Sequence, residues 1–213
     1  MKTNVFVLVV GSLFCMALMA SATTRYVNLN NAAPAPPYTN WSTAATNIQD
    51  AVDAAETGDV IWVTNGVYAT GAREVYGMSN RVAVTQAVTV QSVNGPAVTT
   101  IAGYQEPDTT NGATAVRCVY LTNGAVLAGF TLTNGATQLS GDYYQDQWGG
   151  GVLSESASAV VSNCVLTGNS AYIGGGANDG TLNNCTLTGN SAQYGGGAYG
   201  STLNNCTLAG NSA

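Results

Sequence analysis

The sequence of 213 residues predicts an all-β fold, a right-handed parallel β-helix with about 21 residues per coil and a short N-terminal capping α-helix. Three observations predict this class: a repeat in the C-terminal third, apolar residues that alternate within each repeat, and Gly or Asn between the apolar stretches. Alternation is typical of short strands, whereas helical repeats are longer and place apolar residues about every 3.6 positions. Stacked coils pair their strands in parallel and share one core.

The repeat is clearest around three cysteines, Cys164, Cys185 and Cys206, which recur with a constant 21-residue period. In each copy Asn comes immediately before Cys, and the copy ends in Gly-Asn-Ser-Ala. Three Gly-Gly-Gly runs accompany the repeat, at 149–151, 174–176 and 195–197. The first of these runs is displaced by four inserted residues, which indicates that an earlier coil is longer than the regular ones.

Coils that stack in register place equivalent side chains in columns along the rod. We expect an inward column of buried thiols that pack as small hydrophobes, formed by Cys164, Cys185 and Cys206. We expect an Asn ladder at one turn, each amide bonding the next, formed by Asn163, Asn184 and Asn205. A second turn column follows the glycines, at Asn169, Asn190 and Asn211. Asn and Gly suit such turns because they tolerate the left-handed backbone.

Less regular strands precede the repeat and extend the same rod. They are expected at Val60–Val63, Arg81–Thr85, Ala87–Val93, Val98–Ile101, Val116–Leu121 and Ala125–Leu132. Residues 60–213 therefore form the predicted β-helix, with room for about seven coils.

Residues 23–59 form the predicted N-terminal segment with its capping helix. Thr46 and Gln49 make a capping-box pattern with Thr46 as the N-cap, and Ile48 and Val52 share one apolar face. Gly58 follows as a helix stop. A helix here would cover the unpaired strand edges of the first coil.

Residues 1–22 have the pattern of a secretory signal peptide. Lys2 gives a positive start, Val5 to Met19 is almost wholly apolar, and Ala20-Ser21-Ala22 is a small-residue cleavage site. The apolar stretch falls short of the roughly 20 residues needed to span a membrane, and no other stretch is long enough. We therefore expect an exported protein in the extracellular space or at the outer-membrane surface.

At the other end the sequence stops in mid-repeat, at Gly210-Asn211-Ser212-Ala213, without a second capping segment. A solenoid needs polar caps for solubility. We therefore expect a C-terminal truncation, with further coils or a partner covering the last coil.

Residue types exclude several activities. The sequence has no His, and its single lysine is Lys2 inside the predicted signal. His-activated nucleophiles, His-ligated metals and lysine chemistry are therefore excluded for the mature chain. The formal net charge of −6 argues against nucleic acid or an anionic membrane as a partner.

The opening segment from Ala44 to Tyr68, with Asn47–Val52 and Gly58–Val63, resembles the N-terminal cap and first coil of the pectin-lyase-like superfamily. The Gly-Gly-Gly-Ala and Gly-Asn-Ser-Ala repeats are similar to those of polymorphic outer-membrane adhesins. The adhesin repeat pairs a Gly-Gly-Ala-hydrophobic block with Phe-x-x-Asn. Here Cys begins the corresponding strand, and Gly-Asn-Ser takes the place of the second block.

The resemblance implies the fold but selects no activity, because lyases, hydrolases, adhesins and inert surface proteins share this rod. Lyases of the superfamily typically need an Arg or Lys base and a carboxylate cluster that holds Ca²⁺. The acids of this chain are scattered, and Arg117, which lies in an expected strand, is expected to be a solvated surface residue. We therefore assign no catalytic residue, metal ligand or cofactor, and Ca²⁺ enters only under the lyase or glycan-binding alternatives.

The candidate binding feature is the insertion from Thr137 to Trp148. Its candidate ligand-binding residues are Asp142, Tyr143, Tyr144, Asp146 and Trp148. The aromatic rings can stack on sugars and the carboxylates can help to hold a cation, or the rings can fold back onto the rod. A second polar loop, Tyr104 to Asn111, is a weaker candidate.

Three functions remain open. The first is a secreted or cell-surface β-helix with a structural, adhesive or surface-interaction role and no catalysis in this segment. The second is a polysaccharide-acting enzyme, a pectate-lyase-like lyase or a glycoside hydrolase. The third is a glycan-binding module that uses the insertion. The expected partner in each case is a polysaccharide or another cell surface.

Overall fold

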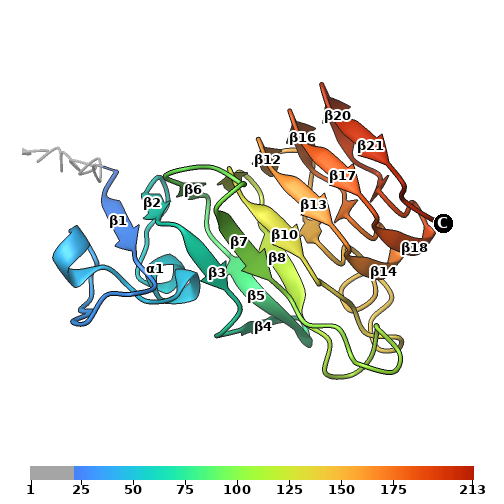
Figure 1. Cartoon of the computed structure of the whole chain (residues 1–213), viewed down its shortest axis with the longest axis horizontal. Coiled ribbons are helices and arrows are strands. Elements are labelled where there is room, and N and C mark those ends of the chain that lie inside the picture. The colour runs from blue at the N-terminus through green and yellow to red at the C-terminus, as the bar shows by residue number, and fades with distance from the viewer. Residues whose placement is uncertain (1–21) are drawn as a thin grey trace, which may run out of the picture.

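The computed structural model describes residues 22–213 as a mostly β chain whose parallel strands lie in stacked sheets (Figure 1). Residues 1–21 of the predicted signal peptide lie outside the described part. The prediction of an all-β chain with parallel strands and regular repeats is confirmed, and the arrangement is compatible with a β-helix.

Three sheets run along the length of the molecule, and the chain passes from one to the next in turn. The first contains β1 (Thr24–Val27), β2 (Val60–Val63), β6 (Thr89–Ser92), β9 (Val126–Ala128), β12 (Val160–Ser162), β16 (Thr181–Asn183) and β20 (Thr202–Asn204). The second contains β3 (Gly66–Tyr68), β7 (Thr99–Ala102), β10 (Thr131–Thr133), β13 (Val165–Thr167), β17 (Thr186–Thr188) and β21 (Thr207–Ala209).

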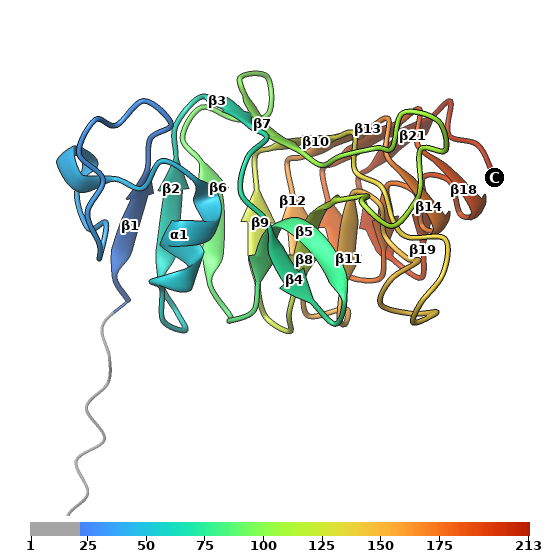
Figure 2. The same ribbon diagram turned by 90° about the horizontal axis from the view of Figure 1, so that it is seen from below.

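The third sheet carries the candidate site. It contains β4 (Arg73–Val75), β5 (Met78–Val84), β8 (Arg117–Leu121), β11 (Val152–Ser154), β15 (Ala177–Asn178) and β19 (Ala198–Tyr199). Only β4 pairs antiparallel in this sheet, with β5. A two-stranded sheet of β14 (Ser170–Ile173) and β18 (Ser191–Tyr194) adds a further face to the C-terminal coils (Figure 2).

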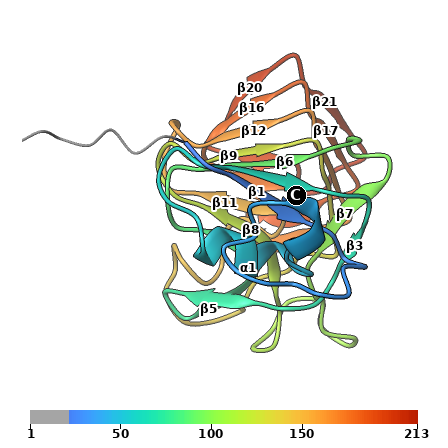
Figure 3. The same cartoon turned by 90° about the vertical axis from the view of Figure 1, so that its left-hand side faces the viewer.

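One continuous core lies between the sheets, which surround it when the molecule is viewed from its N-terminal side (Figure 3). In the second sheet Leu132, Leu166 and Leu187 occupy equivalent register positions and are fully buried. Parallel pairing satisfies the backbone, and burying an aliphatic side chain of this size stabilises the fold by about 1.5–3 kcal/mol.

The 21-residue interval holds only in the C-terminal coils. The paired strands of the first sheet start at Thr24↔Val60, Val60↔Thr89, Thr89↔Val126, Val126↔Val160, Val160↔Thr181 and Thr181↔Thr202. Only the last two of these pairs keep the period of the cysteines, and the earlier pairs are all further apart in sequence. The estimate of about seven coils beyond Val60 was therefore too high, since six strands of this sheet lie there. Longer loops in the upstream coils account for the difference.

Two expected elements need correction. The single strand expected over Ala125–Leu132 is divided into β9 and β10, because the chain turns at Gly129, whose φ is +78°. A left-handed backbone of this kind is accessible to Gly at little cost. In addition, β1 precedes the helix and pairs with β2, so the first sheet begins before the predicted cap.

The capping helix is α1 (Ile48–Asp53), and a short 3₁₀ turn, η1 (Trp41–Thr43), precedes it. Its N-cap is Asn47 rather than Thr46, because the Asn47 side chain accepts the backbone N–H of Asp50 at 2.8 Å. Ile48 and Val52 are buried against the core, as their shared face predicts.

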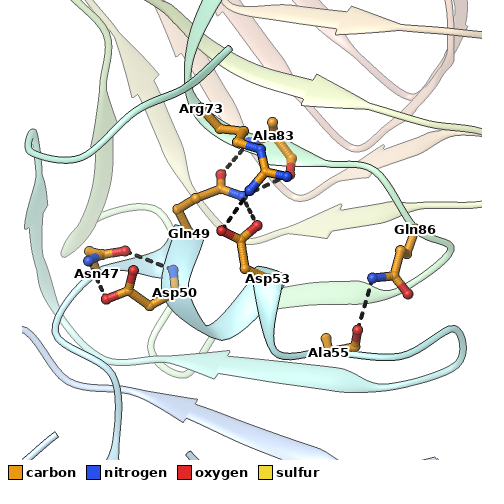
Figure 4. Close-up of polar contacts among 8 residues, drawn as sticks. All are labelled: Asn47, Gln49, Asp50, Asp53, Ala55, Arg73, Ala83 and Gln86. Carbon is orange, nitrogen blue, oxygen red and sulfur yellow. Dashed lines mark hydrogen bonds and ion pairs between the residues drawn. The ribbon is translucent and has the colours of Figure 1, made fainter. Parts of the chain in front are cut away.

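Gln49 ties this helix to the third sheet (Figure 4). Its Oε1 accepts the backbone N–H of Ala83 at 2.7 Å, and its Nε2 donates to the carbonyl of Ala83 at 3.2 Å. The side-chain amide therefore makes the two hydrogen bonds that a neighbouring strand would make to β5. Such pairing covers a strand edge that would otherwise be free to join another chain.

The best-connected Asn ladder lies inside the rod, in the column after the glycines. Asn169 Nδ2 donates to Asn190 Oδ1 at 3.0 Å, and Asn190 Nδ2 donates to Asn211 Oδ1 at 2.9 Å. Asn169 and Asn190 are buried, so these bonds satisfy amides that would be costly to leave unpaired.

The other Asn column, at Asn163, Asn184 and Asn205, is exposed, and all three residues have φ near +50°. Asn205 Nδ2 donates to Asn184 Oδ1 at 2.6 Å, which is the one rung between these three side chains within residues 22–213. The backbone N–H of Asn163 donates instead to the carbonyl of Asn183 at 2.9 Å. This column therefore serves mainly the left-handed turn.

The cysteine column faces the core. Cys164 and Cys185 are buried, Cys206 is half-buried, and all three are free thiols, as is Cys118. Burial raises the pKa of Cys118 to about 12 and also raises the pKa of Cys164. These protonated thiols behave as small apolar side chains in the core.

Candidate functional site

Six aromatic side chains gather where the insertion loop meets the C-terminal coils. This aromatic cluster consists of Tyr143, Tyr144, Trp148, Tyr172, Tyr194 and Tyr199. Trp148 lies at its centre, with ring centroids 5.5 Å from Tyr143, 4.6 Å from Tyr144 and 6.1 Å from Tyr199.

The cluster continues along the rod. Tyr172 lies 5.9 Å from Tyr143 and 5.9 Å from Tyr194, which comes from the next coil. All the pairs are edge-to-face, a favoured geometry for aromatic rings. Tyr144 remains 60% exposed, so ring faces stay open to solvent.

A pocket of about 380 Å³ opens beside this cluster. Tyr120, Tyr144 and Trp148 form its aromatic wall. Its polar side contains Ser154, Glu155, Asn178 and Asp179, with Asn123 and Gln145 at the margin. The volume falls in the usual range for small-molecule sites, about 300–1,000 Å³.

Strand register brings the polar side together. Leu153 of β11 pairs with Asn178 of β15. Ser154 and Asp179, each one position further along, therefore occupy neighbouring positions in adjacent coils, and Glu155 follows at the end of β11. The third sheet thus holds both carboxylates at the same end of its strands, where the chain leaves the scaffold for the next turn.

Neutral donors hold both carboxylates of the pocket. The Tyr120 hydroxyl donates to Glu155 Oε1, and the Thr122 hydroxyl donates to Glu155 Oε2 at 2.7 Å. Asn178 Nδ2 donates to Asp179 Oδ2 at 2.9 Å. Burial raises the pKa of Asp179, against the opposing effect of the Asn178 hydrogen bond.

Three buried polar atoms at this pocket have no hydrogen-bond partner: Trp148 Nε1, Ser154 Oγ and Asn178 Oδ1. Ser154 is 2% exposed and Asn178 is fully buried. An unpaired buried polar atom costs about 1–3 kcal/mol, so such atoms are rare in structures that do not use them. Together they mark the pocket as a site with unused hydrogen-bonding capacity.

Arg117 holds the insertion loop and is fully buried, so the prediction of a solvated surface residue was wrong. Its guanidinium donates to the carbonyls of Gln145 and Trp148 at 2.5 and 2.8 Å, and to Asn80 Oδ1 at 2.8 Å. Burial lowers its pKa to about 9, although the nearby Asp146 opposes this shift. These bonds fix the backbone that carries Trp148.

The structure separates the loop residues that the sequence grouped together. Tyr143, Tyr144 and Trp148 meet in the aromatic cluster, whereas Asp142 and Asp146 stabilise the loop itself. Asp142 Oδ1 accepts the backbone N–H of Tyr144 at 2.9 Å, and Asp146 Oδ2 accepts that of Asp142 at 2.7 Å. Neither Asp142 nor Asp146 lines the pocket.

Sequence reasoning missed Glu155 and Asp179 as a pair, because it looked for acids that recur with the 21-residue period. In the third sheet, the paired strands β11 and β15 are separated by more than 21 residues in the sequence, as the register partners Val152 and Ala177 show. The Gly runs show this interval, since Gly149 and Gly174 are separated by it, but it aligns Asp179 with Ser154 and not with Glu155.

The second loop forms a different, polar pocket of about 410 Å³, lined by Gln105, Thr109 and Asn111 together with Ser170 and Ser191. Glu106 lies in this loop and accepts the backbone N–H of Thr114 at 2.7 Å. Its carboxylate is therefore used to hold the loop, and this pocket has neither the aromatic wall nor the unpaired buried atoms of the first.

Three further observations bear on function. Within residues 22–213 no three Cys, Asp or Glu side chains lie close enough together to hold a metal ion. Over the same residues, no helix has the length and apolar character needed to cross a membrane. Comparison of the chain with protein-family models, with curated proteins and with solved structures found no significant match.

Proposed function

We propose that this chain is a right-handed parallel β-helix of the pectin-lyase-like type, exported to the cell surface, where it binds glycans in an adhesive role. The regular coils supply a rigid scaffold, and the insertion loop supplies the contact surface. The observation that carries the proposal is the aromatic cluster beside a pocket with unpaired polar atoms.

The chemistry of a sugar matches this arrangement. A pyranose has an apolar face of C–H groups and a rim of hydroxyls. Tyr144 and Trp148 provide aromatic ring faces for the apolar C–H face of the sugar. Glu155, Asn178 and Asp179 provide acceptors for its hydroxyls. Sites of this kind combine an apolar wall with a few placed polar groups that give specificity.

The proposal is tested with a glycan array and affinity electrophoresis on the Tyr144→Ala and Trp148→Ala variants. We expect each variant to weaken retention by at least ten-fold. Tyr104→Ala is the matched control, because Tyr104 is a comparably exposed tyrosine that does not line the pocket. Unchanged retention in both pocket variants contradicts glycan binding at this site.

A polysaccharide-cleaving enzyme is the second candidate, because two carboxylates share the pocket. Glycoside hydrolases use one carboxyl as a general acid and the other as a base or nucleophile. The raised pKa of Asp179 suits the acid, and Glu155, held by two hydroxyls, suits the partner. Release of reducing ends from a polysaccharide, abolished by Glu155→Gln and by Asp179→Asn, supports this candidate; a glycan that binds and stays intact excludes it.

Export is a separate part of the proposal. It rests on the sequence pattern of residues 1–22. N-terminal sequencing of the protein recovered from the medium or the cell surface should begin at Thr23. Protein that retains Met1 in the cell contradicts export.

A further inference from the structure

The pocket lies in a part of the chain that contains acids but no basic residue. Every Arg precedes Cys118, and residues 118–213 contain no Lys, Arg or His. The acids in this part are Asp142, Asp146, Glu155 and Asp179, and two of the four line the pocket. A ligand that enters therefore meets negative charge from the protein.

Among the described residues, no cation neutralises the two pocket carboxylates. The ion pairs within residues 22–213 are Arg25 with Asp59 and Arg73 with Asp53, and neither involves the pocket. The Arg117 guanidinium is buried and does not line the pocket. Its hydrogen bonds go to carbonyl and amide oxygens, so the charges of Glu155 and Asp179 stay uncompensated.

The donors that do reach these carboxylates are neutral. The hydroxyls of Tyr120 and Thr122 and the amide of Asn178 orient Glu155 and Asp179 without cancelling their charge. Asp179 is half-buried and Glu155 is exposed, and a carboxylate without a counter-ion gains more from a cation than from a further neutral donor.

The pocket also has acceptors without donors. Asn178 Oδ1 is buried and unpaired, and the unpaired Ser154 Oγ can accept as well. These acceptors need a ligand with N–H or O–H donors, whereas Trp148 Nε1, the unpaired donor of the same pocket, suits a hydroxyl oxygen of a sugar. A protonated amine supplies three donors and the missing positive charge in a single group.

We propose that this pocket selects amino sugars, in which an ammonium group meets Glu155 and Asp179 while the sugar ring stacks on Tyr144 and Trp148. This inference rests on the proposed glycan binding and names its ligand class. Neutral sugars keep the stacking but lose the charge pairing. Uronates bring a like charge to the carboxylates and are disfavoured.

The test uses the full chain and four oligosaccharides of equal length, built from glucosamine, N-acetylglucosamine, glucose or galacturonate. The first three share their linkage and differ only at C2, so they isolate the amine. Calorimetry at low salt should give at least ten-fold tighter binding of the glucosamine oligomer than of the glucose oligomer. Added salt should reduce that ratio, because it screens exposed charges.

Variants separate charge from stacking. Glu155→Gln combined with Asp179→Asn removes both charges, keeps an amide oxygen at each position, and should remove the ten-fold preference for the glucosamine oligomer. Asp108→Asn is the control for the loss of an acid, because Asp108 is exposed and does not line the pocket. Thermal melts establish that each variant is folded.

The outcomes distinguish this inference from the function on which it rests. Equal binding of the glucosamine and glucose oligomers, or tightest binding of the galacturonate oligomer, overturns the amino-sugar inference and leaves glycan binding intact. Binding of none of the four, and of no glycan on the array, overturns both. A preference for glucosamine that survives the double variant overturns the assignment to Glu155 and Asp179.

Discussion

The coils beyond residue 152 and the coils before it are built on different rules. In the C-terminal part many contacts recur 21 residues later, as in the buried ladder of Asn169, Asn190 and Asn211. In the N-terminal part the contacts occur once each, as in the pairing of Gln49 with Ala83 or the burial of Arg117. Repetition makes the C-terminal part a uniform scaffold. Single contacts allow the N-terminal part to carry insertions of different lengths.

The candidate site lies where these two parts meet. Trp148 comes from a loop whose backbone Arg117 holds, and Asp179 comes from a repeating coil. The irregular side therefore contributes the aromatic residues Tyr144 and Trp148 to the candidate site, and the coils beyond residue 152 contribute most of its polar residues.

The largest loss of stability is expected at a glycine where two regular coils lie in close contact. A Cβ at Gly175 would overlap the backbone carbonyls of Ser191 and Gly196 in the next coil. Gly175→Ala should therefore cost about 3 kcal/mol or more of the free energy of unfolding, measured in urea. Gly189→Ala is the matched control, since its Cβ meets nothing within 4 Å, and its positive φ should cost about 1 kcal/mol. Equal losses in both variants contradict close packing as the cause.

The irregular part should depend most on its buried arginine. Arg117→Met removes the donors to three carbonyls and Asn80, and should cost about 3 kcal/mol. Arg73→Ala, which breaks an exposed ion pair with Asp53, should cost about 1 kcal/mol or less. Chemical denaturation measures both, and a mild effect of Arg117→Met argues that the loop is held by other contacts.

The interior ladder should stabilise the fold more than an exposed bond between two Asn side chains of adjacent coils. Asn190→Ala removes the side-chain donor to the Leu166 carbonyl and the acceptor of the buried backbone N–H of Asn169, and should cost about 2 kcal/mol. Asn204→Ala, which removes an exposed amide bond to Asn183, should stay within about 0.5 kcal/mol. Similar melting temperatures for the two variants show that the ladder does not stabilise the coils.

The smallest change in stability is expected for substitution of Asp179. Because burial raises its pKa in the folded state, the folded protein binds the proton more tightly, and stability falls as pH rises above about 3.9, the ordinary Asp value. Asp179→Asn should raise the melting temperature at neutral pH, and the gain should disappear below that pH. A gain that is independent of pH assigns the effect to something other than ionisation.

The regular coils could be predicted well from the sequence, because residues at equivalent positions of each repeat have the same structural role. Alternating Leu182 and Leu187 around Cys185 identified short strands, and the structure buries all three. The longer and unequal upstream intervals could not be predicted, because loop length leaves little trace in the strand pattern. The N-cap was predicted one residue too early, because Thr46 and Asn47 are adjacent polar residues and either type can cap a helix.

The candidate site was predicted in part. The aromatic residues of the insertion stood out as an unusual loop, and they do meet. Tyr172 and Tyr199 could not be grouped with them, because only the register of separate coils brings their rings to Trp148 and Tyr143. Arg117 was misjudged because alternation alone does not reveal which strand face a later insertion will cover.

The Gln49 side-chain amide makes the hydrogen bonds that a neighbouring strand would make to β5. This contact has a consequence for how the number of coils can vary during evolution. The hydrogen bonds of this amide go to the backbone of Ala83 and to Asp53 of the same helix, so this contact is independent of the number of coils that follow. Gain or loss of a whole repeat unit by unequal recombination would leave this end intact, because each coil contacts only its neighbours. The number of coils can therefore drift between lineages while the rod keeps the same beginning.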